Sequence, residues 1–71
     1  MPQKKKITYN RIKAVLAETS NSNKELSEKL GVAAETVSRW CTNDSQPSIE
    51  TLFQIAKILD VDIRELLVKT K

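Results

Sequence analysis

The polar residues best placed to do chemistry lie between residues 34 and 42, where four of them share one face of a predicted helix. These outward positions are Glu35, Ser38, Arg39 and Thr42. An arginine on such a face can donate two hydrogen bonds to the O6 and N7 atoms of a guanine. Alternatively, Arg39 forms a surface ion pair with Glu35, which precedes it by one helical turn. The same residues therefore permit either recognition of a nucleic-acid base or a solvated helix face.

Catalysis and metal binding are disfavoured by what the chain lacks. Its 71 residues contain no histidine, one cysteine and one glycine. These counts exclude a Ser-His-Asp or Cys-His nucleophile, a glycine-rich phosphate loop and a cysteine–histidine zinc site. Cys41 is expected to be a buried or half-buried thiol, because a redox sensor needs a neighbour such as histidine to activate it. We therefore expect no enzyme activity, no metal ion and no cofactor.

The cellular location and the charge pattern can also be read from the chain. A single cysteine allows no internal disulfide bond, which fits a reducing compartment. No apolar run approaches the ~20 residues of a membrane span, and no signal-peptide pattern is present. The net charge is +3, and residues 1–13 hold five basic side chains and no acidic one. We expect a cytoplasmic protein without a membrane partner, with a flexible basic tail over residues 1–6 and one domain over residues 7–71.

Two short helices joined by a tight turn are predicted to position the face that carries Arg39. Ser22 and Glu25 have the spacing of a capping box, in which each side chain accepts a hydrogen bond from the other residue's amide. Gly31 suits the left-handed position that ends a helix. The next helix starts near residue 33 or 34. It is predicted to turn three residues inward: Ala33, Val37 and Trp40. Two helices so closely joined form a helix-turn-helix and leave the outer face of the second helix exposed.

Three further helices complete the predicted fold. The first runs from about Tyr9 to Glu18 with Thr8 as its N-cap, and the fourth follows the N-cap Ser48. The fifth opens at Asp62–Glu65, which has the spacing of a second capping box. The fold class predicted is therefore all-α, a compact domain of five helices with the helix-turn-helix at the second and third. Phe53 lies on the apolar stripe of the fourth helix and is predicted either for the core or for a subunit interface.

Several blocks of the chain, in register, resemble the lambda-repressor-like, Cro-type (XRE) helix-turn-helix family. The blocks are Lys24–Val32, Thr36–Trp40, Gln46–Leu52 and Ile55–Leu67, and the resemblance covers nearly all of residues 9–68. It implies a five-helix DNA-binding domain and a bacterial or phage transcriptional regulator. Such a regulator, most often a repressor, reads a palindromic operator as a homodimer with its third helix in the major groove.

The resemblance also implies which residues meet DNA. Those matching positions that face base edges are Ala34, Glu35, Ser38 and Arg39. Those matching positions near the DNA backbone are Asn23, Thr36, Thr42 and Asn43. Lys4, Lys5 and Lys6 could add backbone contacts in the way basic arms do, or they could serve solubility only. The chain departs from the family at Ala33, which has no capping side chain, at Ala34, which is too short to read a base by hydrogen bonding, and at Cys41, where glutamate is common.

A protein-interaction module is the alternative class of function. Some relatives act as antitoxins or bind a regulatory protein partner with the same fold. A protein-binding face more often shows an exposed apolar patch, whereas the outward face around Arg39 is polar. The dimer surface is predicted on the last two helices, with Phe53, Ile58 and Val68 as candidates. We therefore expect double-stranded DNA and a second copy of the chain as partners, and a regulatory protein as the alternative partner.

Overall fold

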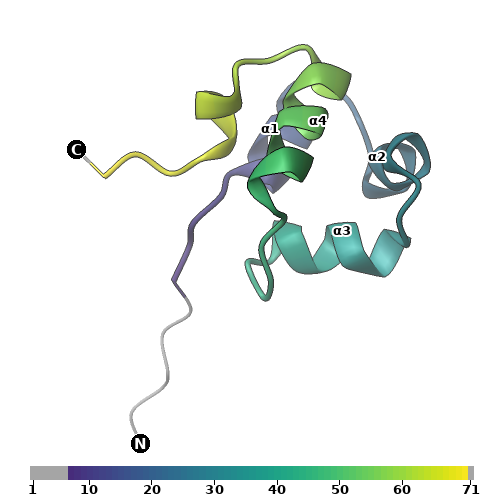
Figure 1. Ribbon diagram of the computed structural model, residues 1–71, viewed down its shortest axis with the longest axis horizontal. Coiled ribbons are helices and arrows are strands. Elements are labelled where there is room, and N and C mark those ends of the chain that lie inside the picture. Colours follow the sequence, from purple (N-terminus) through teal and green to yellow (C-terminus); the bar gives the residue numbers. More distant parts are fainter. Residues whose placement is uncertain (1–6, 71) are drawn as a thin grey trace, which may run out of the picture.

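The computed structural model describes residues 7–70, which form four α-helices and one 3₁₀ turn (Figure 1). The elements are α1 (Ile12–Glu18), α2 (Asn23–Leu30), α3 (Ala34–Cys41), α4 (Ile49–Leu59) and the turn η1 (Ile63–Leu66). In Figure 1, α3 lies along the lower edge of the domain and the other helices lie above it. α2 packs against both α3 and α4, and η1 packs against α4 and α1. One long face of α3 is thereby left without a neighbour.

The predicted fold of five helices is wrong in its last element, because residues 63–66 form only the single turn η1. The capping box expected there does not close. The Asp62 carboxylate accepts from the amide of Arg64 at 2.8 Å rather than from that of Glu65. The Glu65 side chain turns instead toward Arg11, at 3.9 Å. Over residues 7–70 the correct description is an all-α fold of four α-helices and the 3₁₀ turn η1.

Pairing between the two ends of the domain explains why η1 does not continue as a helix. The amide of Arg11 donates to the carbonyl of Leu66 at 2.8 Å, and the amide of Val68 donates to the carbonyl of Tyr9 at 3.0 Å. These bonds surround an isolated antiparallel bridge between Asn10 and Leu67. The chain after Leu66 is therefore extended and lies beside residues 9–11.

The same pairing shortens the first helix at its start. α1 begins at Ile12 rather than at Tyr9, and Thr8 is not its cap. The N-cap position is Arg11, whose side chain makes no capping bond. Asn10, one residue earlier, accepts from the amide of Ile12 through its Oδ1 atom at 3.0 Å. Residues 9–11 are non-helical because their backbone groups bond to the C-terminal segment and to the loop after α3.

The caps predicted for α2 and α4 are confirmed. Ser22 Oγ accepts from the amide of Glu25 at 3.0 Å, and the Glu25 carboxylate accepts from the amide of Ser22 at 2.9 Å. These bonds hold the pKa of Glu25 below its usual value of 4.5. Gly31 ends α2 with φ of +75°, where a side chain would be strained. Ser48 caps α4 by accepting from the amide of Thr51 at 3.1 Å.

One hydrophobic core joins all the elements. Its buried members are Ile12, Val15, Leu16, Leu26, Val37, Trp40, Leu52, Ile55, Ala56, Leu59 and Leu66. Trp40 is 6% exposed, which confirms its core position. Ala33 is exposed, so the prediction that it faces inward is wrong. Phe53 is 60% exposed and does not belong to the core. The basic segment over residues 1–6 lies outside the described residues.

Candidate nucleic-acid interface

The free face of α3 is held from behind by two buried side chains. Val37 and Trp40 are 0% and 6% exposed and anchor the helix in the core. The four residues predicted to face base edges all lie on the exposed side: Ala34, Glu35, Ser38 and Arg39. α3 therefore presents a polar surface on a helix that is anchored in the core by its opposite face. A convex helix face of this kind fits a groove in a partner molecule.

Arg39 is available for a partner in this arrangement. Within residues 7–70, the ion pairs involve only Arg11 and Arg64 as cations, and Arg39 is not joined to Glu35. The ion pair between Arg39 and Glu35, which was the alternative to base recognition, is thus not formed. The Arg39 guanidinium keeps its five donors for an external acceptor.

The ends of α2 and α3 meet at one side of this face. Asn23 is the first residue of α2 and Cys41 is the last residue of α3. The Cys41 thiol donates to Asn23 Oδ1 at 3.5 Å. Thr42 follows directly, and its exposed hydroxyl bonds to the Asp44 carboxylate at 2.7 Å. Thr36 is half-buried on α3. Asn23 and Thr42, two of the residues predicted near phosphates, are therefore brought to the same edge of the interface.

Asn43 has a use inside the fold that the sequence did not reveal. Its Oδ1 atom accepts from the amides of Tyr9 and Asn10 at 2.9 and 3.1 Å, and its Nδ2 atom donates to the carbonyl of Asn10 at 3.3 Å. Its φ of +61° is left-handed, a conformation that asparagine tolerates better than most residues. The side chain thus fastens the N-terminal segment to the loop after α3.

Asn10 is the second residue of this junction, and no pattern in the sequence singled it out. It is only 4% exposed. Its Nδ2 atom donates to the Trp40 carbonyl at 3.0 Å and to Gln46 Oε1 at 2.7 Å. The Trp40 carbonyl belongs to the last turn of α3, where helix carbonyls lack helical partners. Asn10 therefore ties the end of α3 to the start of α1.

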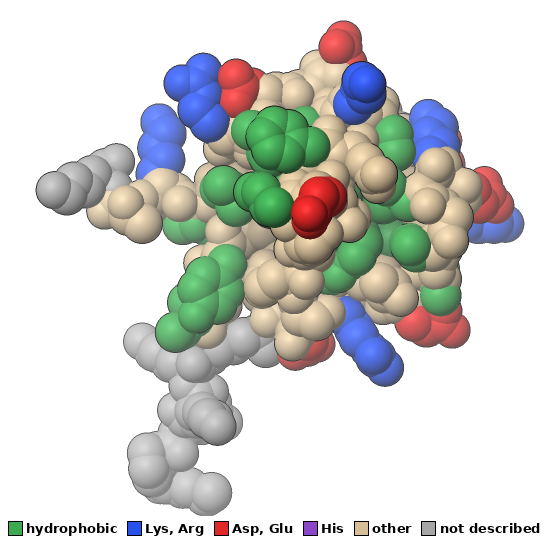
Figure 2. Space-filling model, viewed as in Figure 1, with side chains coloured by type: hydrophobic (Ala, Val, Ile, Leu, Met, Phe, Trp, Pro, Cys, Tyr) green, Lys and Arg blue, Asp and Glu red, His purple; other side chains and the backbone are tan. Residues whose placement is uncertain are grey.

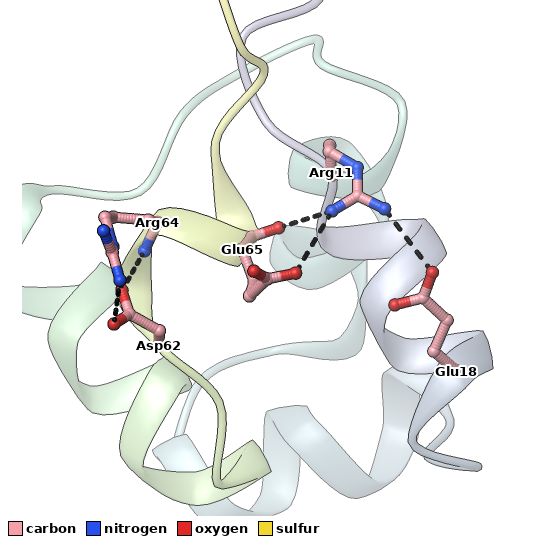
Figure 3. A network of polar contacts seen from close by, with 5 residues as sticks. All are labelled: Arg11, Glu18, Asp62, Arg64 and Glu65. Atoms are coloured by element: carbon pink, nitrogen blue, oxygen red, sulfur yellow. Dashed lines mark hydrogen bonds and ion pairs between the residues drawn. The ribbon is translucent and has the colours of Figure 1, made fainter.

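Charged side chains from α1 and η1 and from the residues that precede them form surface ion pairs (Figure 3). Arg11 reaches Glu18 at 3.4 Å and Glu65 at 3.9 Å, and also donates to the Glu65 carbonyl at 2.9 Å. Arg64 pairs with Asp62 at 3.0 Å and holds the pKa of that carboxyl below its usual value of 3.8. Exposed pairs of this kind contribute little stability. Arg11 and Arg64 are thus paired with carboxylates of the protein, whereas Arg39 forms no such pair within residues 7–70.

Neither a metal site nor a membrane-spanning helix is found over residues 7–70. These residues contain no cluster of three or more histidine, cysteine or acidic side chains that could hold a metal ion. No helix among them has the length and apolarity that crossing a membrane requires.

Comparison with known proteins agrees with this geometry. The helix-turn-helix family HTH_3, of the XRE type, matches residues 12–66. The chain belongs to this family. It is also similar to a crystal structure of a candidate DNA-binding protein from Bacteroides fragilis, with 49% identity and a TM-score of 0.82 over 83% of this chain and 95% of that one. No curated protein gave a match. This match confirms the resemblance to the XRE family that the sequence indicated. DNA-binding helix-turn-helix families are generally not enzymes.

Proposed function

We propose that this helix-turn-helix protein binds double-stranded DNA in a sequence-specific way and represses transcription from a palindromic operator in the cytoplasm. The observation that carries the proposal is the exposed face of α3, with an unpaired Arg39, mounted on the buried side chains of Val37 and Trp40. The similarity to a candidate DNA-binding protein from Bacteroides fragilis supports it. An α-helix of this size fits the major groove of B-form DNA.

Base recognition in this proposal rests on α3. Arg39 donates to guanine O6 and N7, which discriminates against other bases by about 1–3 kcal/mol. Glu35 accepts from cytosine N4 or steadies Arg39 once DNA is bound. Ser38 bonds to a base edge, and Ala34 contacts a thymine methyl group.

Backbone contacts set the register of α3 in the groove. Asn23 and Thr42 contribute from the shared edge of α2 and α3, and Thr36 contributes from α3 itself. Asn43 has one amide hydrogen left for a phosphate, because the other is given to the Asn10 carbonyl. Lys4, Lys5 and Lys6 add charge from the basic tail.

A homodimer is the form we propose to bind DNA. One such domain touches few base pairs, and a two-fold dimer reads two half-sites about one helical turn apart. Figure 2 shows hydrophobic side chains gathered over α4 and the two terminal segments. The exposed hydrophobic residues of these elements are Ile7, Tyr9, Ile49, Phe53, Leu67 and Val68. Ile58, the third residue predicted for the interface, packs against the core instead.

The same apolar surface favours one alternative function. A regulatory or toxin-like protein could cover it, and protein binding would then be the main role of the chain. Such a surface is compatible with DNA binding through α3, because the exposed hydrophobic residues lie on other elements.

The test is a selection from a random duplex library at fixed salt, with the wild type and with Arg39→Ala. We expect a two-fold symmetric motif whose guanine preference weakens in the variant by roughly 5- to 150-fold, from about 1–3 kcal/mol. Arg64→Ala is the matched control, since Arg64 is exposed on η1 and pairs only with Asp62. Enrichment of no motif by the wild type, with only weak and steeply salt-dependent binding, would exclude a sequence-specific regulator.

A further inference from the structure

A surface cleft beside the proposed backbone-contacting edge is lined by Lys13, a basic residue for which the sequence predicted no contact. The cleft has a volume of about 570 Å³ and is lined on one side by Lys13, Ala14 and Ala17 of α1 and on the other by Cys41 and Thr42. Lys13 is exposed, and it forms no ion pair with any residue of the described range 7–70. Its positive charge is therefore not compensated within this part of the protein.

Cys41 lies near Lys13 and does not neutralise its positive charge. The thiol is half-buried, and burial raises its pKa, although the nearby charge of Lys13 opposes this effect. Cys41 is therefore a neutral thiol at physiological pH. A carboxylate at this position would neutralise the lysine, whereas a thiol does not.

The thiol also forms a hydrogen bond with the side chain of Asn23. A thiol is a weak donor, and Asn23 Oδ1 accepts from it at 3.5 Å. The Nδ2 group of Asn23 is then turned away from the sulfur. A phosphate oxygen can only accept hydrogen bonds, so an asparagine that contacts it must present this group.

We propose that Lys13 binds a phosphate of the DNA backbone, and that Cys41 positions Asn23 to donate to the same stretch of backbone. The cation comes from α1, the amide from the first turn of α2 and the orienting thiol from the end of α3. This inference rests on the proposed DNA binding and adds two residues, Lys13 and Cys41, to its interface.

The salt dependence of binding to the selected duplex tests the role of Lys13. Each neutralised phosphate contributes about 0.9 to the slope of log K against log salt concentration. A homodimer carries two copies of Lys13, so we expect Lys13→Gln to lower the slope by about 1.8, which is about 0.9 for each protomer. We expect Lys13→Arg to keep the slope and Lys57→Gln on α4 to leave it unchanged. Thermal unfolding of each variant confirms that it is folded.

Two substitutions at Cys41 test whether its neutrality matters. Cys41→Ser stays neutral and keeps a donor, so the slope should match the wild type. Cys41→Glu places a carboxylate beside Lys13, and the slope should fall by about as much as in Lys13→Gln. A wild-type slope for Cys41→Glu would contradict the role assigned to Cys41.

A double-mutant cycle tests the positioning of Asn23. Asn23→Ala should weaken binding of the homodimer by roughly tenfold, about threefold for the neutral hydrogen bond lost in each protomer, without changing the salt slope. In a Cys41→Ala background the same change should have almost no effect, because the orienting thiol is already gone. Equal losses in both backgrounds would overturn the positioning role.

The outcomes separate this inference from the proposal on which it rests. If the wild type binds its motif and Lys13→Gln has an unchanged slope, Lys13 does not touch DNA, and sequence-specific binding still stands. If the wild type binds no duplex specifically, the proposed function fails and the inference falls with it.

Discussion

Two stretches of this chain share one capping pattern and fold differently. Ser22–Glu25 and Asp62–Glu65 each place an acceptor side chain three residues before a glutamate. The first closes as a capping box and opens the eight residues of α2. The second opens only the four residues of η1. A capping pattern thus locates where a helical turn starts, and it does not decide how far the helix continues.

The residues after each cap explain the difference. After Glu25, Leu26 is buried and Leu30 packs against the core, so each added turn of α2 buries more apolar surface until Gly31 ends it. After Glu65, only Leu66 is buried. The next residue bridges to Asn10, and the backbone obtains its hydrogen bonds from the N-terminal segment instead of from another helical turn. A capping pattern is followed by a full helix where the next residues also pack against the core. Where they do not, hydrogen bonds to a distant segment of the chain end the helix.

The largest expected effect comes from breaking the junction that receives the C-terminal segment. Asn10→Ala removes the donor to the Trp40 carbonyl and to Gln46, and it removes the acceptor of the buried Ile12 amide. We expect a loss of about 2–3 kcal/mol in the free energy of unfolding, measured by urea denaturation. Asn21→Ala is the matched control, because Asn21 Nδ2 donates only to Thr19. If both variants lose the same small amount, the junction does not hold the two ends together.

A smaller effect is expected from removing the cap that did form. Ser22→Ala should cost about 1 kcal/mol in the free energy of unfolding, since the Glu25 amide loses its acceptor. Ser45→Ala, in an exposed loop, should change it by less than about 0.5 kcal/mol. Asp62→Ala should lower the urea midpoint less than Ser22→Ala does, because η1 is a single exposed turn. The reverse order would mean that the second cap matters more than the first.

The smallest effect expected is a pH dependence that arises at Glu25. The folded state holds the pKa of this carboxyl below 4.5, chiefly through its bonds to Ser22. Its contribution to stability is therefore complete above about pH 4.5 and is lost as pH falls through the lowered pKa. Glu25→Gln keeps an acceptor but does not titrate, so its stability should fall less steeply than that of the wild type between pH 5 and about pH 2.5. Parallel pH profiles for the two proteins would contradict this assignment.

The part of the candidate interface that lies on α3 could be predicted from the sequence, because it depends on the helical spacing of residues close together in the chain. The spacing of Val37 and Trp40 predicted that one face of α3 packs against the core and that Arg39 lies on the opposite, exposed face. Ala33 was misplaced because a residue just before the first turn of α3 does not follow the helical period. Lys13 was missed because its place beside Cys41 depends on the packing of α1 against α3, residues far apart in the chain.

The sequence by itself determined the helix-turn-helix: a capping box, a left-handed glycine and a periodic apolar face act within a few residues of one another, and all three agree. The tertiary structure decided the two ends of the domain. Tyr9, Asn10 and Arg11 obtain their backbone partners from residues 43, 66 and 68, more than thirty positions away. No local pattern records such a choice, because the chain must fold before these groups can meet.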